Sequence, residues 1–279
     1  MSTRQILIAV DMEGITGVVD KSHVLPTEKD YGRFCKLMTA EVNEAIKGAF
    51  EGGADGVVVS DGHGRSLNLL IEELDSRVSI NSGSPSPLSM VQGADQGVDA
   101  ALFVGYHARW GTLNGVLAHT YLLNVVNLWF NDKPVGEIGM NASILGHFGV
   151  PVLMISSDQA GCDEAAEFIP GIETVAVKQG RGMFSAECLP PEITHKMIKE
   201  TAKKAVHNFK NGKAPQPVQT DQPVTLRLEL ASALQADNAS CVPGAARIDG
   251  RTIEMTAPDI VEAHKCFCTL AKLAGPNFA

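Results

Sequence analysis

The chain has 279 residues, of which 44% are hydrophobic and 20% are charged, an ordinary composition for a globular protein. Its formal net charge of -9, without a run of lysine or arginine, argues against nucleic acid and against an anionic membrane surface as partners. No apolar run approaches the ~20 residues of a membrane span, and the apolar run near the N-terminus is too short for a secretory signal.

The first predicted element is a strand over residues 6–10, where five apolar residues run directly into Asp11, Met12 and Glu13. A short apolar run of this kind is typical of a strand buried on both faces of a parallel sheet. Side chains alternate along a strand, so Asp11 and Glu13 should point the same way and repel each other. Exposure to solvent would relieve that repulsion, and so would a bound cation; this motif alone leaves both explanations open.

Helices and strands then alternate up to residue 209. Apolar residues from Phe34 to Phe50 recur at helical spacing, and Gly52 with Gly53 indicates the end of that helix. Strands that alternate with helices predict a mostly parallel sheet covered by helices. The other predicted elements of this part are a strand at 57–59, a helical segment at 67–75, a strand at 101–104, a hairpin with its turn at Asn131 and Asp132, a helix that begins near Glu137, strands at 150–158 and 173–179, and a helix at 191–209.

The chain changes character near Pro215. Residues 223–230 alternate strictly between apolar and polar, residues 246–256 contain an Asp-Gly hairpin turn, and residues 258–273 are predicted to form a closing helix. We therefore predict an α/β fold in two parts. Residues 1–214 are expected to form a larger domain with a mostly parallel, helix-covered sheet, and residues 215–279 a smaller α+β portion.

Six cysteines are scattered over the chain, and only two of them, Cys266 and Cys268, are close in sequence. These two lie in a segment predicted to be helical, where residues two apart point to different sides. No disulfide framework or paired C-x-x-C motif is indicated. We interpret all six as reduced thiols and predict a cytoplasmic protein.

Residues of the types that bind metals follow three of the predicted strands. Asp11 and Glu13 follow the first strand, His63 lies in the turn after the second, and His107 follows the strand at 101–104. Ligands of parallel sheets bind beyond the carboxyl ends of the strands, so these side chains should meet at one edge. Glu137, at the start of a predicted helix, is a fifth candidate.

Each of these residues also has an ordinary explanation when it is taken alone. His63 lies between two glycines and could belong to a turn, and His107 could pack beside Tyr106. Glu137 could interact with the dipole of its helix. Because these residues are expected to lie at one edge of the sheet, a common role is favoured over a separate explanation for each of them.

The number of candidate ligands predicts a pair of zinc ions. If one of the three carboxylates bridges two cations, each cation has three protein ligands, and a bridging water completes the four that zinc prefers. Three carboxylates and a hydroxide also balance the charge of two zinc ions. We predict that Asp11, nearest the strand end, is the bridge. Asp61 is a competing ligand or a partner of a ligating histidine.

Other catalytic motifs are absent: the sequence contains no H-E-x-x-H, G-x-S-x-G or P-loop motif. Among the remaining histidines, His119 follows the His107 loop and lies between apolar residues. A packed core histidine and a functional histidine explain it about equally well. The others are assigned no role and are interpreted as surface or helix residues: His23, His147, His195, His207 and His264.

Four motifs in order, "VDMEGITG", "SDGHG", "GYHA" and "NDKPVGEIGMNA", resemble the DppA-type D-aminopeptidases of metallopeptidase family M55. The resemblance covers nearly the whole chain. It implies a cytoplasmic aminopeptidase with two zinc ions per subunit that acts on short peptides with an N-terminal D-amino acid, assembled as a decameric ring. The family's zinc ligands correspond to Asp11, Glu13, His63, His107 and Glu137, its bridging aspartate to Asp11, and its catalytic histidine to His119.

The implied mechanism is metal-assisted hydrolysis of the peptide bond. The family's histidine is described as a nucleophile, but an acyl-imidazole formed from an unactivated amide lies uphill. We therefore expect His119 to transfer a proton or to stabilise an oxyanion. Two alternatives are another dinuclear amidase or L-selective peptidase on the same scaffold, and a peptide-binding protein without catalysis.

Overall fold

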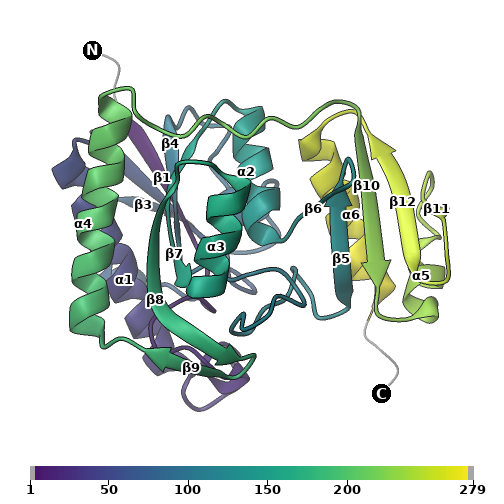
Figure 1. Cartoon of the computed structure of the whole chain (residues 1–279), viewed down its shortest axis with the longest axis horizontal. Coiled ribbons are helices and arrows are strands. Elements are labelled where there is room, and N and C mark those ends of the chain that lie inside the picture. Colours follow the sequence, from purple (N-terminus) through teal and green to yellow (C-terminus); the bar gives the residue numbers. More distant parts are fainter. Residues whose placement is uncertain (1–3, 276–279) are drawn as a thin grey trace.

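The computed structural model describes residues 4–275 and contains two β-sheets with helices packed on them (Figure 1). The larger sheet has seven strands in the order β3-β2-β1-β4-β7-β8-β9. Neighbouring strands are parallel except at one edge, where β9 runs antiparallel to β8. The bounds of these strands are β1 Gln5–Val10, β2 Gly56–Asp61, β3 Ser79–Asn81, β4 Ala100–Val104, β7 Val152–Asp158, β8 Glu173–Gly182 and β9 Ser185–Cys188.

Strand β1 illustrates why a helix-covered parallel sheet forms. Its side chains alternate between two buried faces, with Ile6 and Ile8 on one face and Leu7 on the other. Both faces are covered by helices, which confirms the predicted α/β fold class. None of the helices within residues 4–275 combines the length and the apolar character needed to cross a membrane. The helices that cover the Ile8 face of the larger sheet are α1 (Tyr31–Gly52) and α4 (Pro191–Lys210). Those that cover the Leu7 face are α2 (Glu137–His147) and α3 (Gln159–Phe168) (Figure 1).

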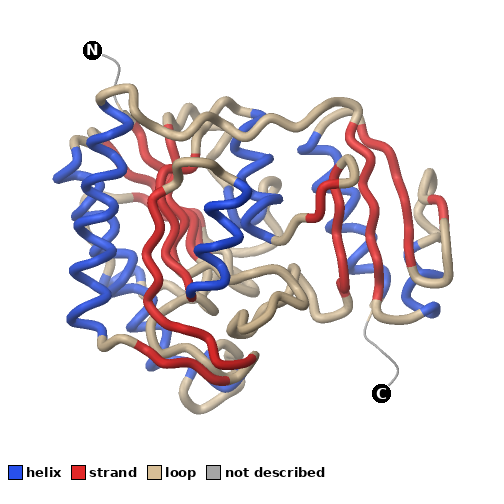
Figure 2. The backbone as a smooth tube through the Cα atoms, viewed as in Figure 1, coloured by secondary structure: helices blue, strands red, loops and turns tan. Residues whose placement is uncertain are grey.

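The smaller sheet has five strands in the order β11-β12-β10-β5-β6, and helix α6 packs against it (Figure 2). Helix α6 also contacts α2, so one apolar core extends from the larger sheet to the smaller one. The smaller sheet includes residues 125–134 from before the predicted boundary, and the division after residue 214 stays a prediction. The remaining elements are β5 Val125–Phe130, β6 Lys133–Pro134, β10 Val224–Leu230, α5 Ala233–Ala239, β11 Ala246–Arg247, β12 Thr252–Ala257 and α6 Ile260–Ala274.

The predicted hairpin with its turn at Asn131 and Asp132 is present as β5 and β6. Both turn residues have left-handed φ angles, 50° and 64°, as the tight turns that connect antiparallel strands require. The hairpin carries the chain out to the smaller sheet and back to α2. Glu137 therefore arrives at the first position of a helix that packs on the larger sheet.

Residues 67–75 do not form the predicted helix; only Ile71–Glu73 adopts a short 3-10 turn. The carboxylate of Asp61 accepts hydrogen bonds from the main-chain N–H groups of Asn68 at 2.6 Å and Leu69 at 2.9 Å. These bonds hold the segment in a loop, and local apolar spacing gives no sign of them. The sequence prediction also lacked α3, α5, β3, β9 and the short 3-10 helices Lys21–His23 and Ser89–Val91.

Candidate metal centre

The carboxyl ends of β1, β2 and β4 bring the candidate ligands side by side. Strand β1 lies between the other two, with Val10 opposite both Asp61 and Val104. Hydrogen bonds continue past the strand ends: the Asp11 N–H donates to the Val104 carbonyl oxygen at 2.8 Å, and the Gly62 N–H donates to that of Val10 at 2.8 Å. The three loops therefore leave the sheet together, as its topology predicts.

Two glycines allow the loops after β1 and β4 to pack main chain against main chain. The Gly14 N–H donates to the Gly105 carbonyl oxygen at 2.8 Å. A Cβ atom at Gly14 would lie 1.9 Å from the carbonyl oxygen of Tyr106, and Gly105 has a φ of +73° that favours glycine. This close approach sets the spacing between Glu13 on one loop and His107 on the other.

Asp11 lies between two imidazole rings. Its Oδ1 is 3.3 Å from Nδ1 of His63, and its Oδ2 is 3.4 Å from Nε2 of His107. The two glutamates complete the group: Oε2 of Glu13 is 3.1 Å from Nδ1 of His63, and Oε1 of Glu137 is 3.2 Å from Nε2 of His107. The five residues thus form two halves that share Asp11, which is the arrangement that a bridging carboxylate requires.

Each of these rings turns one nitrogen to the main chain and the other to the carboxylates. Nε2 of His63 is 2.8 Å from the Val24 carbonyl oxygen, and Nδ1 of His107 is 2.9 Å from that of Ala108. A carbonyl oxygen can only accept, so the single N–H of each neutral ring lies on that side. The other nitrogen of each ring faces carboxylate oxygens, where it can hold a second proton or bind a cation through its lone pair, and this is the orientation of histidines that bind metals.

Two buried atoms at the centre of this group have no hydrogen-bond partner among residues 4–275: Oδ2 of Asp11 and Nε2 of His107. An unsatisfied buried polar group costs about 1–3 kcal/mol, more when it is charged. A cation between these atoms would satisfy both, and nitrogen with carboxylate oxygen is a donor set that suits zinc. The residues present therefore fit a metal centre.

The crowding of carboxylates also shifts their protonation. Burial, together with the nearby charge of Glu13, raises the pKa of Asp11 to about 7. Burial opposes charge on the rings, yet Glu13 raises the pKa of His63, and Glu137 that of His107, well above the ordinary value. All three pKa shifts reflect buried carboxylates that have too little positive charge beside them. Two divalent cations would supply that charge.

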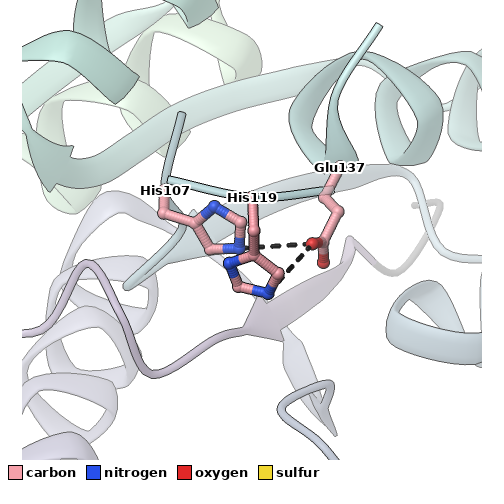
Figure 3. Close-up of side chains that lie close together, drawn as sticks. All are labelled: His107, His119 and Glu137. Carbon is pink, nitrogen blue, oxygen red and sulfur yellow. Dashed lines mark ion pairs between the residues drawn. The ribbon is translucent and has the colours of Figure 1, made fainter. Parts of the chain in front are cut away.

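His119 reaches the same place on the loop that follows β4 (Figure 3). Its ring stacks on His107, with centroids 4.1 Å apart and planes 12° apart. Nδ1 lies 2.8 Å from the Leu117 carbonyl oxygen, and Nε2 lies 3.8 Å from Oε1 of Glu137. His119 is thus a neighbour of the candidate ligands and not a residue of the apolar core. It is also close enough to share a metal with His107 and Glu137.

Asp61 does not join this cluster, although it ends strand β2. Its oxygens accept hydrogen bonds from the main chain of Asn68 and Leu69 and from the Asn68 side-chain amide at 2.7 Å. The same amide donates to the main-chain oxygen of His63 at 2.7 Å. Asp61 therefore shapes the turn that carries His63, and within residues 4–275 it forms no hydrogen bond with an imidazole ring.

The sequence prediction gave no role to Asp158, which ends β7 and anchors the loop that carries His119. Its Oδ2 accepts a hydrogen bond from the Val116 N–H at 2.6 Å, and its Oδ1 caps α3 through the Gly161 N–H at 2.7 Å. The signal was present in the sequence, since an aspartate at the end of a buried strand is also the pattern at Asp11.

Comparison with known proteins gives concordant results. The family model Peptidase M55, described as D-aminopeptidase, matches residues 5–269. A D-aminopeptidase of Bacillus subtilis (strain 168) is 37% identical over 271 residues, which cover 97% of this chain and 97% of that protein. The solved structure of DppA from Bacillus subtilis, a zinc-dependent D-aminopeptidase and self-compartmentalizing protease, matches with a TM-score of 0.95 and 35% identity over 99% of this chain and 100% of that one.

Proposed function

This chain belongs to the metallopeptidase family M55 of D-aminopeptidases, and we propose that it uses two zinc ions per subunit to hydrolyse short peptides or amides with an N-terminal D-amino acid. The observation that carries the proposal is the position of Asp11 between two histidine–glutamate pairs. The family and its relatives support the enzyme class and the substrate class, and the geometry of this chain supports the metal centre.

The two halves of the site divide the ligands between the zinc ions. Asp11, Glu13 and His63 would hold one ion, and Asp11, His107 and Glu137 would hold the other. When bound, zinc supplies an activated water molecule and a Lewis acid for the scissile carbonyl group. The carbonyl oxygens of Val24 and Ala108 accept the ring N–H groups and would thereby orient both histidines for metal binding.

His119 transfers protons in this proposal. Its Nδ1–H is held by the Leu117 carbonyl oxygen, so Nε2 of the neutral ring carries a lone pair toward the site. That atom can take a proton from the attacking water and pass it to the leaving amine. Oxyanion stabilisation would instead need an N–H at Nε2, and therefore a second proton on the ring. Three ligands for each ion are already present without His119.

The proposal predicts a stereochemical preference that can be measured directly. Purified protein should contain close to two zinc equivalents per chain. It should release ammonia from D-alanine amide at least about tenfold faster than from L-alanine amide, a difference of ~1.4 kcal/mol in activation free energy. Equal or reversed rates would favour an L-selective peptidase or another dinuclear amidase. No turnover of any short peptide or amide would favour a peptide-binding protein.

We further propose that the chain assembles with copies of itself, as a ring of ten subunits. The matched DppA is a self-compartmentalizing protease, and this chain exposes apolar side chains that could be covered in an assembly, among them Leu113, Leu123 and Phe184. Light scattering after gel filtration should give ten times the mass of one chain, and a monomer would refute the ring. The cytoplasmic location indicated by the cysteines stays a prediction.

A further inference from the structure

Lys178 of β8 is a lysine whose side chain lies entirely inside the protein, with 1% of the residue exposed. The pairing of β7 with β8 shifts register here: Ser157 lies opposite Ala176, Asp158 lies opposite Lys178, and Val177 is the additional residue. A bulge of this kind re-aims the side chains that follow it. As a result Val177 and Lys178 are both buried, although they are consecutive residues of a strand.

The ammonium group of Lys178 binds the loop that carries Glu13. Its Nζ donates to three main-chain carbonyl oxygens, those of Glu13, Ile15 at 2.9 Å and Val18 at 2.6 Å. An ammonium group has three N–H donors, so all of them are used on this one loop. The first acceptor belongs to a candidate zinc ligand, and Lys178 has no such contact with His107 or Glu137.

Burying a charged side chain to stabilise a loop carries a large desolvation free-energy cost. Burial lowers the pKa of Lys178 to about 8, which reflects the cost of desolvating its ammonium group. Glu41 of α1 holds the other side of the loop by accepting the Thr16 N–H at 2.9 Å, and Glu41 is also fully buried. Apolar residues of similar volume often give equal or greater stability than buried charges. We therefore interpret these buried groups as holding the loop in a defined position, and not as a means of stabilising the fold.

We propose that Lys178 is a positioning residue for Glu13, and that it fixes the main chain from which the Glu13 carboxylate reaches the zinc half-site with Asp11 and His63. This inference rests on the proposed function. Loss of a group that orients a metal ligand typically weakens metal binding about 10–100-fold. The loss should be confined to this half-site, because His107 and Glu137 lie on other segments and the N–H of the shared ligand Asp11 is held by the Val104 carbonyl oxygen and not by Lys178.

The substitution Lys178→Met tests the inference, since methionine keeps a long unbranched side chain and removes the charge and the donors. In a chelator competition, one of the two zinc ions should bind about 10–100-fold more weakly and the other should be unchanged. The weakened ion should be the one lost in His63→Ala, so the double variant should lose no further zinc. Saturating zinc should restore most of the turnover, with little change in KM.

Thr194→Val is the matched control. The Thr194 hydroxyl accepts a hydrogen bond from the Thr16 hydroxyl at 2.8 Å, so this variant disturbs the same loop without touching the Glu13 carbonyl. Both of its zinc affinities should stay at the wild-type values. A loss in Thr194→Val equal to that in Lys178→Met would mean that any weakening of the loop has the same effect, and would overturn the assignment to Lys178.

Lys178→Gln is the second variant. The glutamine amide has two N–H donors for the three carbonyl oxygens, so we expect a smaller loss of zinc affinity than in Lys178→Met. Wild-type affinity for both ions in Lys178→Met would overturn the inference and leave the proposed function intact. Equal weakening of both ions, or failure of both variants to fold in saturating zinc, would identify a stability role and also overturn it. A wild-type protein that binds no zinc would overturn the proposed function itself.

Discussion

Replacing Asp11 with asparagine should remove both zinc ions and reduce hydrolysis to the level of chelator-treated wild-type protein. Asparagine keeps the shape of the side chain, but it removes one negative charge and one oxygen donor from the residue that faces both His63 and His107. Zinc should be counted after dialysis against a range of chelator concentrations, and turnover should be measured on D-alanine amide. Both ions should be lost at chelator concentrations that leave wild-type protein fully loaded.

His63→Ala is the control for this prediction, because His63 contacts Asp11 and Glu13 but lies in only one half of the site. This variant should lower the affinity for mainly one of the two zinc ions. The metal-free Asp11→Asn protein should be at least as resistant to thermal unfolding as the metal-free wild type, since one of three crowded carboxylates has been neutralised. Near-normal zinc content and activity in Asp11→Asn would show that the bridge is another residue.

Replacing His119 with alanine should reduce kcat by about 10²–10⁴-fold while the protein keeps its fold and both zinc ions. The expected loss is that of a general acid or base, whose Nε2 is directed to the site because Nδ1 is bound to the Leu117 carbonyl oxygen. The measurements are kcat on a D-aminoacyl amide, zinc content, and circular dichroism. Loss of one zinc equivalent would instead identify His119 as a ligand together with His107 and Glu137.

His119→Gln separates the possible roles of this residue. Glutamine roughly preserves the volume stacked against His107 and can donate a hydrogen bond, but it cannot accept and release a proton at neutral pH. We therefore expect His119→Gln to be as inactive as His119→Ala. Recovery of part of the activity would favour oxyanion stabilisation, and an acyl group trapped on His119 would establish a nucleophile.

The fold class, the family and the residues that surround the candidate metal centre could all be predicted from the amino-acid sequence. A run of apolar residues specifies a strand buried on both faces, and parallel strands bring their carboxyl ends to one edge. The strands that precede Asp11, His63 and His107 could therefore be placed side by side without coordinates. The four motifs led to the family that the comparisons support over nearly the whole chain.

The way in which these side chains are held became apparent only from the folded chain. Val24 orients His63, Asp158 anchors the His119 loop, and Lys178 binds the carbonyl of Glu13, in each case from a distant part of the chain. The helical pattern at residues 67–75 failed because two main-chain N–H groups of that segment donate to Asp61, and the Leu70 N–H donates to the hydroxyl of the distant Thr39 at 3.1 Å. The periodicity of apolar residues along the sequence indicates which face of a helix or strand is apolar. Hydrogen bonds between distant segments depend on where folding brings them, so local pattern does not encode them.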